Sequence, residues 1–201
     1  MDARAAAAAH NREHAVNRFL RNIPNLLTGL RLACAPALAG LLLFEQERAA
    51  LAVFVFAGLT DAADGWLAKR FGLATRFGRY LDPAADKLLM LTAFLALTAM
   101  GATPLWLTAV VIGRDFVIVS AILLAKLMEL PLRVAPLPIG KLCTAAQVGY
   151  IALVLVVLAF DLDWPQISAF AGVVAGAFTI ASWLAYAQLW LRAAARGRRA
   201  A

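Results

Sequence analysis

Six long apolar stretches follow one another along the chain, with only short connections between them. We place them near residues 26–44, 48–68, 83–100, 104–127, 141–160 and 165–190. One helical bilayer crossing takes about 20 apolar residues, so stretches of this length are typical of membrane spans. Long apolar runs without alternating polarity satisfy their backbone hydrogen bonds in lipid only as helices. We therefore predict an all-α integral membrane bundle of six transmembrane helices.

Composition limits what else the chain can contain. Apolar residues make up 63% of it and charged residues only 15%, against about 25% charged residues in a typical soluble domain. Six spans take roughly 120 of the 201 residues, which leaves too few for a separate soluble domain. We predict a basic N-terminal arm at 1–21, either an interfacial helix or solvated, a membrane domain at 22–191 and a basic tail at 192–201. Cys34 and Cys143 lie in apolar stretches, so we expect buried, reduced thiols.

Basic residues are distributed unequally between the two sides of the predicted bundle. The N-terminal arm, the second and fourth connections and the tail hold fifteen Lys and Arg residues, whereas the other three connections hold Arg48 alone. This asymmetry predicts that both termini are cytoplasmic. The net charge of +7 then indicates contact with anionic head groups or phosphates, and we expect no nucleic-acid partner. We expect a multi-pass protein of the bacterial inner membrane whose active site faces the cytoplasm.

Four aspartates stand where the second span ends and the third begins. Asp61 and Asp64 are three residues apart, and Asp82 and Asp86 are four apart, so each pair occupies one face of its helix. The two spans are antiparallel neighbours joined by a short loop. We therefore expect both pairs to lie at the same depth in the membrane.

Something positive must neutralise these carboxylates, because an aspartate within a span costs about 2.5–3.5 kcal/mol. One alternative is a salt-bridge network with the nearby Lys69, Arg70 and Arg79. The other is bound Mg²⁺ or Mn²⁺, with room for two ions, since carboxylate oxygens suit hard cations and no His or Cys is adjacent. Gly65 and Ala68 leave the helix face beside the carboxylates without bulk. Metal-binding carboxylates beside a cluster of cations indicate a site for a polyphosphate.

Residues 61–86 resemble the signature of the CDP-alcohol phosphatidyltransferase family, D-x2-D-G-x2-A-R-x8-G-x3-D-x3-D. Seven of the eight fixed positions match at the right spacing, and the exception is Lys69, where the family has Arg. An ammonium group cannot replace the bidentate guanidinium fork, so the phosphate contact at Lys69 differs from the family's. The resemblance extends to residues 22–31, to Arg114-Asp115 and to the segment around Lys141, and covers roughly residues 20–190.

The resemblance implies a role for each residue of the predicted site. It implies two Mg²⁺ or Mn²⁺ ions held by Asp61, Asp64, Asp82 and Asp86. It implies that Asp86 is also the catalytic general base on the acceptor hydroxyl. The residues that it implies for binding CDP-diacylglycerol are Asp61, Gly65, Ala68, Lys69, Arg70, Arg76 and Gly78. The implied reaction transfers a phosphatidyl group from CDP-diacylglycerol to a hydroxyl with release of CMP, and the family is usually dimeric, so we expect a homodimer.

The acceptor of the phosphatidyl group is the less constrained part of the prediction. Arg31, Arg114 and Lys141 could form a pocket for the acceptor's phosphate, or could be purely structural. Two branches of the family share these features, the cardiolipin synthases, whose acceptor is phosphatidylglycerol, and the phosphatidylglycerophosphate synthases, whose acceptor is glycerol 3-phosphate. The second branch typically has a further Arg two helical turns after the one that matches Arg114, where this chain has Ile122. A dianionic phosphate needs more positive charge than a phosphodiester, so we favour phosphatidylglycerol, an anionic phospholipid, over glycerol 3-phosphate.

A divalent-cation transporter is the alternative from another functional class. Such a protein would also place carboxylates inside helices, but near the midplane, over several spans and often with His. The chain's two histidines, His10 and His14, both lie in the N-terminal arm. A membrane scaffold without activity gives no reason to collect four aspartates beside a gap of small residues. We therefore favour the phosphatidyltransferase.

Overall fold

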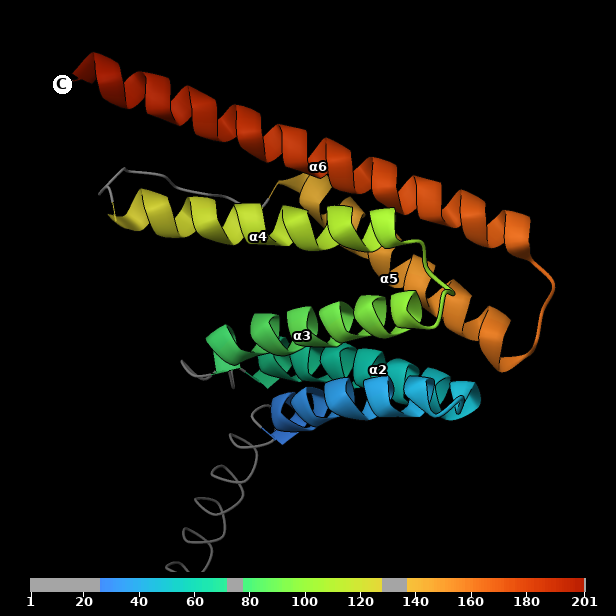
Figure 1. Ribbon diagram of the computed structural model, residues 1–201. Helices are drawn as coiled ribbons and strands as arrows, with labels where there is room; N and C mark the ends of the chain where they lie inside the picture. The colour runs from blue at the N-terminus through green and yellow to red at the C-terminus, as the bar shows by residue number, and fades with distance from the viewer. Residues whose placement is uncertain (1–25, 72–77, 128–136, 201) are drawn as a thin grey trace, which may run out of the picture. The chain divides into compact units, whose positions relative to one another are not determined.

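The described part of the chain is built from helices (Figure 1). The computed structural model describes residues 26–71, 78–127 and 137–200, and only the backbone at 64–71, 78–81, 121–126, 190 and 192–200. Its six helices are an N-terminal helix at Leu26–Leu43, α2 at Glu47–Phe71, α3 at Gly78–Ala99, α4 at Leu105–Leu127, α5 at Pro138–Ala159 and α6 at Pro165–Ala200. The predicted all-α fold is confirmed, with a helix at each of the six predicted stretches.

The two largest differences from the predicted spans are at the start of α3 and at the end of α6. We predicted the third span from about residue 83. The structure begins α3 earlier, at Gly78, and keeps Pro83 inside the helix, so Asp82 and Asp86 lie on one helix, as their spacing predicts. We expected the last helix to end near residue 190, yet α6 continues to Ala200. Its extension is rich in Ala and Arg, which are among the best helix formers in water.

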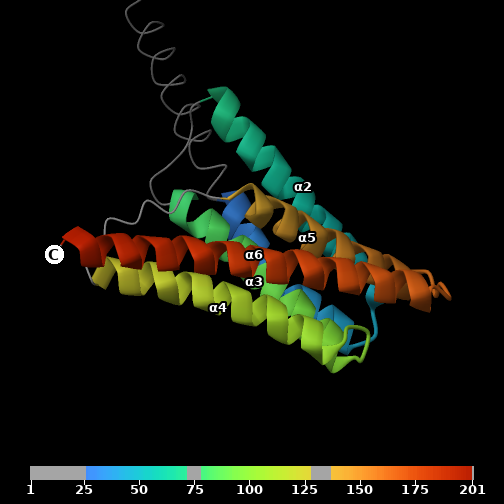
Figure 2. The same cartoon turned by 90° about the horizontal axis from the view of Figure 1, so that it is seen from above.

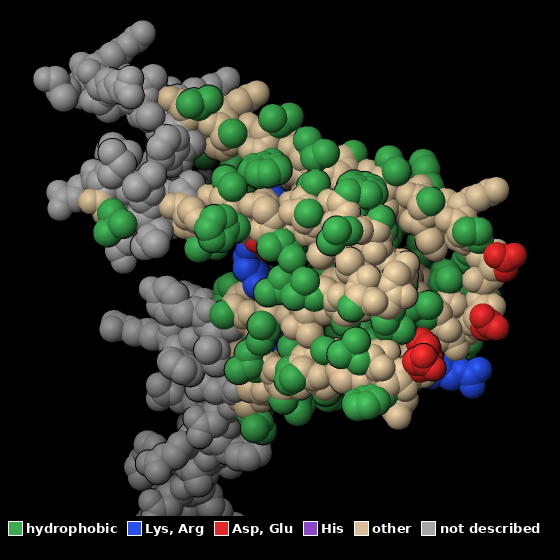
Figure 3. All heavy atoms as spheres, in the orientation of Figure 1, with side chains coloured by type: hydrophobic (Ala, Val, Ile, Leu, Met, Phe, Trp, Pro, Cys, Tyr) green, Lys and Arg blue, Asp and Glu red, His purple; other side chains and the backbone are tan. Residues whose placement is uncertain are grey.

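Three of the described helices are long and apolar enough to cross a membrane. They are Leu26–Leu43, Pro138–Ala159 and, within α6, Pro165–Leu189. Large hydrophobic side chains are also strongly exposed, among them Phe44, Phe116 and Phe170, and hydrophobic side chains are distributed widely over the described part of the face in Figure 3. Such exposure is unfavourable in water and favourable in lipid. The chain is a membrane protein, and the crossing of all six helices stays a prediction.

The chain divides into two units, Met1–Ala93 and Phe94–Ala201, and the boundary falls within α3. In the first unit, the N-terminal helix buries Leu38 and Leu42, while α2 buries Ala50 and Ala57 and α3 buries Ala85. Small residues let helix backbones approach closely, which is how helices associate in lipid. This packing places the N-terminal helix against the helices that carry the four aspartates.

In the second unit, α6 packs against both α4 and α5. Figures 1 and 2 show α6 running beside α4 and crossing α5. The approach to α4 is close at Gly176, where an added Cβ would lie 2.7 Å from an atom of the Trp106 ring. Cys143 is buried on α5 and, like Cys34 in the first unit, forms no disulfide, which confirms the predicted reduced thiols.

Three short connections use the same cap to end the helix before them. Glu45, Gly101 and Asp161 all have positive φ. At Glu45 the backbone N–H bonds to the Leu42 carbonyl, and the next N–H bonds back to Leu41; the hydrogen bonds at Gly101 and Asp161 follow the same pattern. This is the Schellman motif, which satisfies the last carbonyls of a helix. It lets the chain reverse within three to five residues after the N-terminal helix, α3 and α5.

Candidate active site

Arg31 of the N-terminal helix joins the two acidic helices of the first unit. Its Nη1 lies 2.8 Å from Asp86 Oδ1 on α3 and 3.0 Å from Asp61 Oδ1 on α2. The Arg31 side chain is 1% exposed, whereas those of Asp61 and Asp86 are 51% and 46% exposed. The guanidinium is therefore buried behind two carboxylates that remain accessible from outside.

The third described aspartate is held one helical turn away. Thr28 Oγ1 donates a hydrogen bond to Asp82 Oδ1, and Thr28 is itself buried. Thr28 and Arg31 are three residues apart on the N-terminal helix, and Asp82 and Asp86 are four apart on α3. Each pair shares a helix face, so one polar face of the N-terminal helix meets the acidic face of α3. A threonine and an arginine thus neutralise or hydrogen-bond three of the four predicted ligands.

Several predicted residues lie outside the described side chains. This holds for Asp64, Ala68, Lys69 and Arg70, whose backbone alone belongs to α2, and Arg76 falls in the segment at 72–77. Gly65 lies in α2 and Gly78 is the first residue of α3. Among the side chains that the structure describes, no three His, Cys, Asp or Glu residues are grouped as a metal site, and the predicted four-aspartate site requires Asp64.

The chemistry of the described carboxylates nevertheless suits a hard cation. Asp61 and Asp86 both direct an oxygen at a single positively charged nitrogen, so their oxygens already converge on one centre of positive charge. Carboxylate oxygens are the ligands that Mg²⁺ and Mn²⁺ prefer. The roles of these residues as metal ligands stay a prediction.

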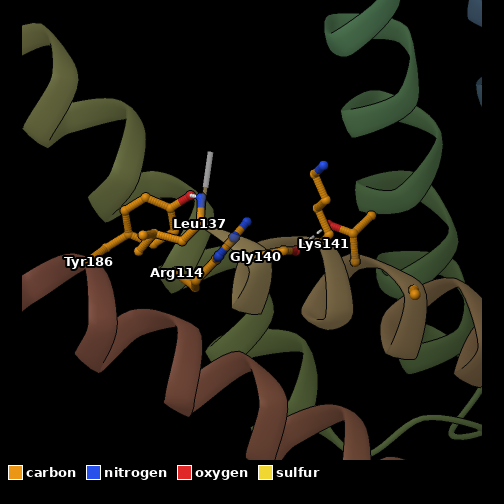
Figure 4. Close-up of a pocket in the computed structure, with 7 residues that line it drawn as sticks. Arg114, Leu137, Gly140, Lys141 and Tyr186 are labelled. Carbon is orange, nitrogen blue, oxygen red and sulfur yellow. Dashed lines mark hydrogen bonds between the residues drawn. The ribbon is translucent and has the colours of Figure 1, made fainter. Parts of the chain in front are cut away.

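The second unit contains an open pocket of about 550 Å³ between α4, α5 and α6 (Figure 4). Its lining residues are Arg114, Leu137, Gly140, Lys141, Thr144, Ala145 and Tyr186. Two of the three cations that the sequence assigned to an acceptor phosphate, Arg114 and Lys141, are thus in one pocket. The third, Arg31, contacts carboxylates of the first unit instead, so its role as a phosphate ligand stays a prediction.

Arg114 is fixed in this pocket by three different groups. Its Nη1 donates to Asp115 Oδ1 at 2.7 Å, and its Nη2 donates to Ser182 Oγ at 3.2 Å. The guanidinium carbon lies 5.8 Å from the centre of the Tyr186 ring, within cation–π range. Its buried Nε makes no hydrogen bond within the described part of the chain. The Arg114 side chain is only 10% exposed, so the pocket holds a nearly buried guanidinium whose Nε is unpaired among the described residues.

Lys141 and the start of α5 form the other wall of the pocket. Lys141 is exposed, and no described carboxylate pairs with it. Leu137 caps α5 without a side-chain hydrogen bond, and Pro138 follows it. Pro138 has no N–H and the Gly140 N–H bonds to the Leu137 carbonyl, so this helix start attracts an anion mainly through the helix dipole. The pocket therefore combines two cations with a helix N-terminus, an arrangement that favours an anion.

The sequence was compared with models of known protein families. The model of the CDP-alcohol phosphatidyltransferase family matches residues 21–191. The chain belongs to this family. The match takes in both the carboxylate cluster of the first unit and the pocket of the second.

Similar CDP-alcohol phosphatidyltransferases come from both predicted branches. A cardiolipin synthase (CMP-forming)/mitochondrial hydrolase fusion protein of Schizosaccharomyces pombe is 34% identical over 197 residues, 88% of this chain and 33% of that protein. A cardiolipin synthase (CMP-forming) of Rattus norvegicus is 34% identical over 69% of this chain and 51% of its own length. A CDP-diacylglycerol–glycerol-3-phosphate 3-phosphatidyltransferase of Bacillus subtilis is 33% identical over 84% of this chain and 95% of its own length. The chain thus spans a third to a half of the first two relatives.

The sequence did not predict three side chains that hold residues of the carboxylate cluster or of the second unit's pocket. Thr28, Ser182 and Tyr186 were assigned no role, although Thr28 holds Asp82, and Ser182 and Tyr186 hold Arg114. A signal for two of them is present in α6, where Thr179, Ser182 and Tyr186 follow at spacings of three and four. Polar residues on one face of an otherwise apolar membrane helix indicate a face turned toward protein.

Proposed function

We propose that the chain transfers the phosphatidyl group of CDP-diacylglycerol to the hydroxyl of an acceptor and releases CMP. The observation that carries this proposal is the convergence of Asp61 and Asp86 on one nitrogen of Arg31, with Asp82 held beside them by Thr28. Membership of the CDP-alcohol phosphatidyltransferase family supports it.

In the proposed reaction, the acceptor's hydroxyl oxygen attacks the phosphorus that carries the diacylglycerol. A new P–O bond forms, the P–O bond to CMP breaks, and CMP leaves with the bonding electrons. Asp86, whose side chain is 46% exposed, is the proposed base that takes the hydroxyl proton. Asp61, Asp64, Asp82 and Asp86 would hold Mg²⁺ or Mn²⁺, proposed as two ions, which would offset the charge of the pyrophosphate. Gly65, Ala68, Lys69, Arg70, Arg76 and Gly78 are the further residues proposed to bind CDP-diacylglycerol.

For the acceptor, we propose phosphatidylglycerol, which makes the chain a cardiolipin synthase. The charges in the pocket of the second unit support this choice. Arg114 is already paired with Asp115 at 2.7 Å, so among the described residues Lys141 supplies the remaining positive charge. A phosphodiester carries one negative charge and a phosphate monoester close to two, so the pocket is better matched to the phosphodiester. The pocket is also open and has Leu137, Ala145 and the Tyr186 ring in its wall, which suits an acceptor that remains in the membrane.

Glycerol 3-phosphate is the second candidate acceptor. It is favoured by the Bacillus subtilis relative, which this chain matches over 95% of that protein's length. Since its phosphate is a dianion, this acceptor requires a second cation besides Lys141 in the pocket, or a rearrangement of the Arg114–Asp115 pair. The two candidates therefore make different demands on the same few residues.

We further propose how the protein sits in the cell. All six helices cross the bilayer, both termini are cytoplasmic, and the carboxylate cluster faces the cytoplasm at the bacterial inner membrane. Residues 22–191 form the membrane domain, between the basic arm at 1–21 and the basic tail at 192–201. The active form is a homodimer, as the family resemblance implies.

The deciding experiment offers the two acceptors separately to the purified protein in lipid nanodiscs with Mg²⁺ and CDP-diacylglycerol. We expect CMP release and cardiolipin with phosphatidylglycerol. Product from glycerol 3-phosphate alone would overturn the proposed acceptor but keep the reaction. Asp86→Asn should abolish CMP release, whereas the matched control Asp163→Asn, which changes an exposed aspartate in the connection before α6, should leave it intact. Normal turnover in Asp86→Asn would refute the proposed base.

A further inference from the structure

Tyr186 links the guanidinium of Arg114 to the start of α5. Its ring lies 5.8 Å from the Arg114 guanidinium carbon, measured to the ring centre. Its Oη accepts a hydrogen bond from the backbone N–H of Leu137 at 3.4 Å, at the residue that caps α5. One side chain of α6 thus touches both components of the pocket that attract an anion, the arginine from α4 and the helix N-terminus of α5.

Gly140 leaves the space that this arrangement needs. A Cβ added at Gly140 would lie 3.2 Å from Tyr186 Oη and 3.6 Å from Arg114 Nη2. The first distance is too short for an unstrained contact, so either the tyrosine hydroxyl or α5 would have to move. Figure 4 shows Arg114 between Tyr186 and Gly140 at the pocket. Elsewhere in α5, Gly149 has nothing within 4 Å of an added Cβ, so the close approach is particular to Gly140.

We propose that Tyr186 is a positioning residue for the acceptor, which it serves by holding the Arg114 guanidinium, and that Gly140 is a glycine because Tyr186 and Arg114 occupy the space of its side chain. This inference rests on the proposed function, since it takes the pocket as the place where the acceptor's phosphate binds. Asp115 and Ser182 each accept a hydrogen bond from one terminal nitrogen of Arg114. The Tyr186 ring adds a cation–π contact, which these hydrogen bonds do not supply.

A purely structural role for Tyr186 makes a different prediction. If the ring only fills space, its loss should lower stability and reduce turnover with every substrate alike. If the ring positions Arg114, its loss should weaken binding of the acceptor but not binding of CDP-diacylglycerol, which is proposed to bind at the aspartates of the first unit. The discriminating quantity is therefore the KM of the acceptor compared with the KM of CDP-diacylglycerol and with kcat.

The test measures KM and kcat with the acceptor that the unchanged protein uses. The variants are Tyr186→Leu, Tyr186→Phe, Gly140→Ala and the double variant Tyr186→Phe/Gly140→Ala. A cation–π contact is worth a factor of roughly two in binding when it is exposed and roughly thirty when it is desolvated. The pocket is open, so we expect an intermediate effect, in which Tyr186→Leu raises the acceptor's KM about five- to tenfold. The KM of CDP-diacylglycerol should stay within about twofold. Gly140→Ala should raise the acceptor's KM as well, and Tyr186→Phe should suppress that defect because it removes the oxygen 3.2 Å from the new methyl group.

Matched controls and outcomes keep this inference separate from the proposed function. Gly149→Ala is the control for Gly140→Ala, because Gly149 also lies in α5 but has open space around it. Tyr150→Phe is the control for Tyr186→Phe, because it also removes a tyrosine hydroxyl, here one that donates to Thr103. Both controls should leave the acceptor's KM unchanged. An unchanged KM in Tyr186→Leu, or a Gly140→Ala defect that persists in the double variant, would overturn the inference. If Tyr186→Leu fails to fold, the Gly140→Ala and Tyr186→Phe pair decides alone. An unaltered protein that releases no CMP would refute the proposed function instead.

Discussion

Replacing Arg31 by leucine removes the positive charge that the two acidic helices share. In the structure one nitrogen of Arg31 contacts Asp86 at 2.8 Å and Asp61 at 3.0 Å. Arg31→Leu leaves both carboxylates negative, close together and without this partner. In the absence of a divalent cation, the variant should therefore be less stable than the unchanged protein.

The size of the loss follows from the burial of the three side chains. Breaking a fully buried ion pair costs about 3–5 kcal/mol, because the remaining charge has no water. Here Arg31 is 1% exposed, but Asp61 and Asp86 are about half exposed, so water can solvate part of the charge that remains. We expect the free energy of unfolding to fall by about 2–3 kcal/mol, which corresponds to a drop in melting temperature of roughly 4–12 °C for a chain of this size.

Thermal unfolding in nanodiscs, with chelator and with Mg²⁺, measures this effect. We expect the drop for Arg31→Leu to be largest in chelator and to shrink with Mg²⁺, because the proposed metal site uses the same carboxylates. In an Asp61→Asn/Asp86→Asn background the same substitution should cost much less, since the charges it exposes are gone. An unchanged melting temperature in chelator, or the same drop in both backgrounds, would refute the reasoning.

Three further predictions concern packing, hydrogen bonding and topology. Gly176→Ala should destabilise the protein by about 1–2 kcal/mol, because overpacking against Trp106 outweighs the gain in helix propensity. Thermal unfolding should show a smaller effect of Gly176→Ala when Trp106 is replaced by Leu. Additive effects of the two substitutions would contradict this contact. Thr28→Val should cost about 1 kcal/mol while Thr28→Ser costs less, and equal melting temperatures would show that the hydrogen bond to Asp82 contributes little. A reporter domain that is active only in the cytoplasm should be active when it is fused to either end of the chain. A reporter domain that is active only outside the cytoplasm should be inactive at both ends, and its activity at either end would refute the proposed orientation.

Much of the fold could be predicted from the sequence because apolar run length determines where helices form in a membrane. The start of α6 at Pro165 was predicted correctly, as was a helix at each predicted stretch. Local rules failed at the helix ends. Pro83 is compatible with a helix interior near its first turn, and the Ala- and Arg-rich tail continues α6 through Gly197, a residue that often ends helices.

The candidate site was predictable only as far as its motif extends. The spacing of Asp82 and Asp86 places both on one helix face, and the structure has both contacting the N-terminal helix. The partner of Asp86 is Arg31, 55 residues away in sequence, and no periodicity or spacing rule reaches that far. Tyr186 was missed for a similar reason, because its contacts with Arg114 and Leu137 depend on how α6 packs.

The long separation between Arg31 and its carboxylates also has a consequence for biosynthesis. The ribosome makes the N-terminal helix first, so the arginine enters the translocon before either aspartate exists. During that interval Arg31, in the second turn of its helix, can be solvated only by extending toward the lipid head groups. The buried position of its guanidinium is therefore expected to form only after Asp86 has been synthesised and α3 has packed against the N-terminal helix.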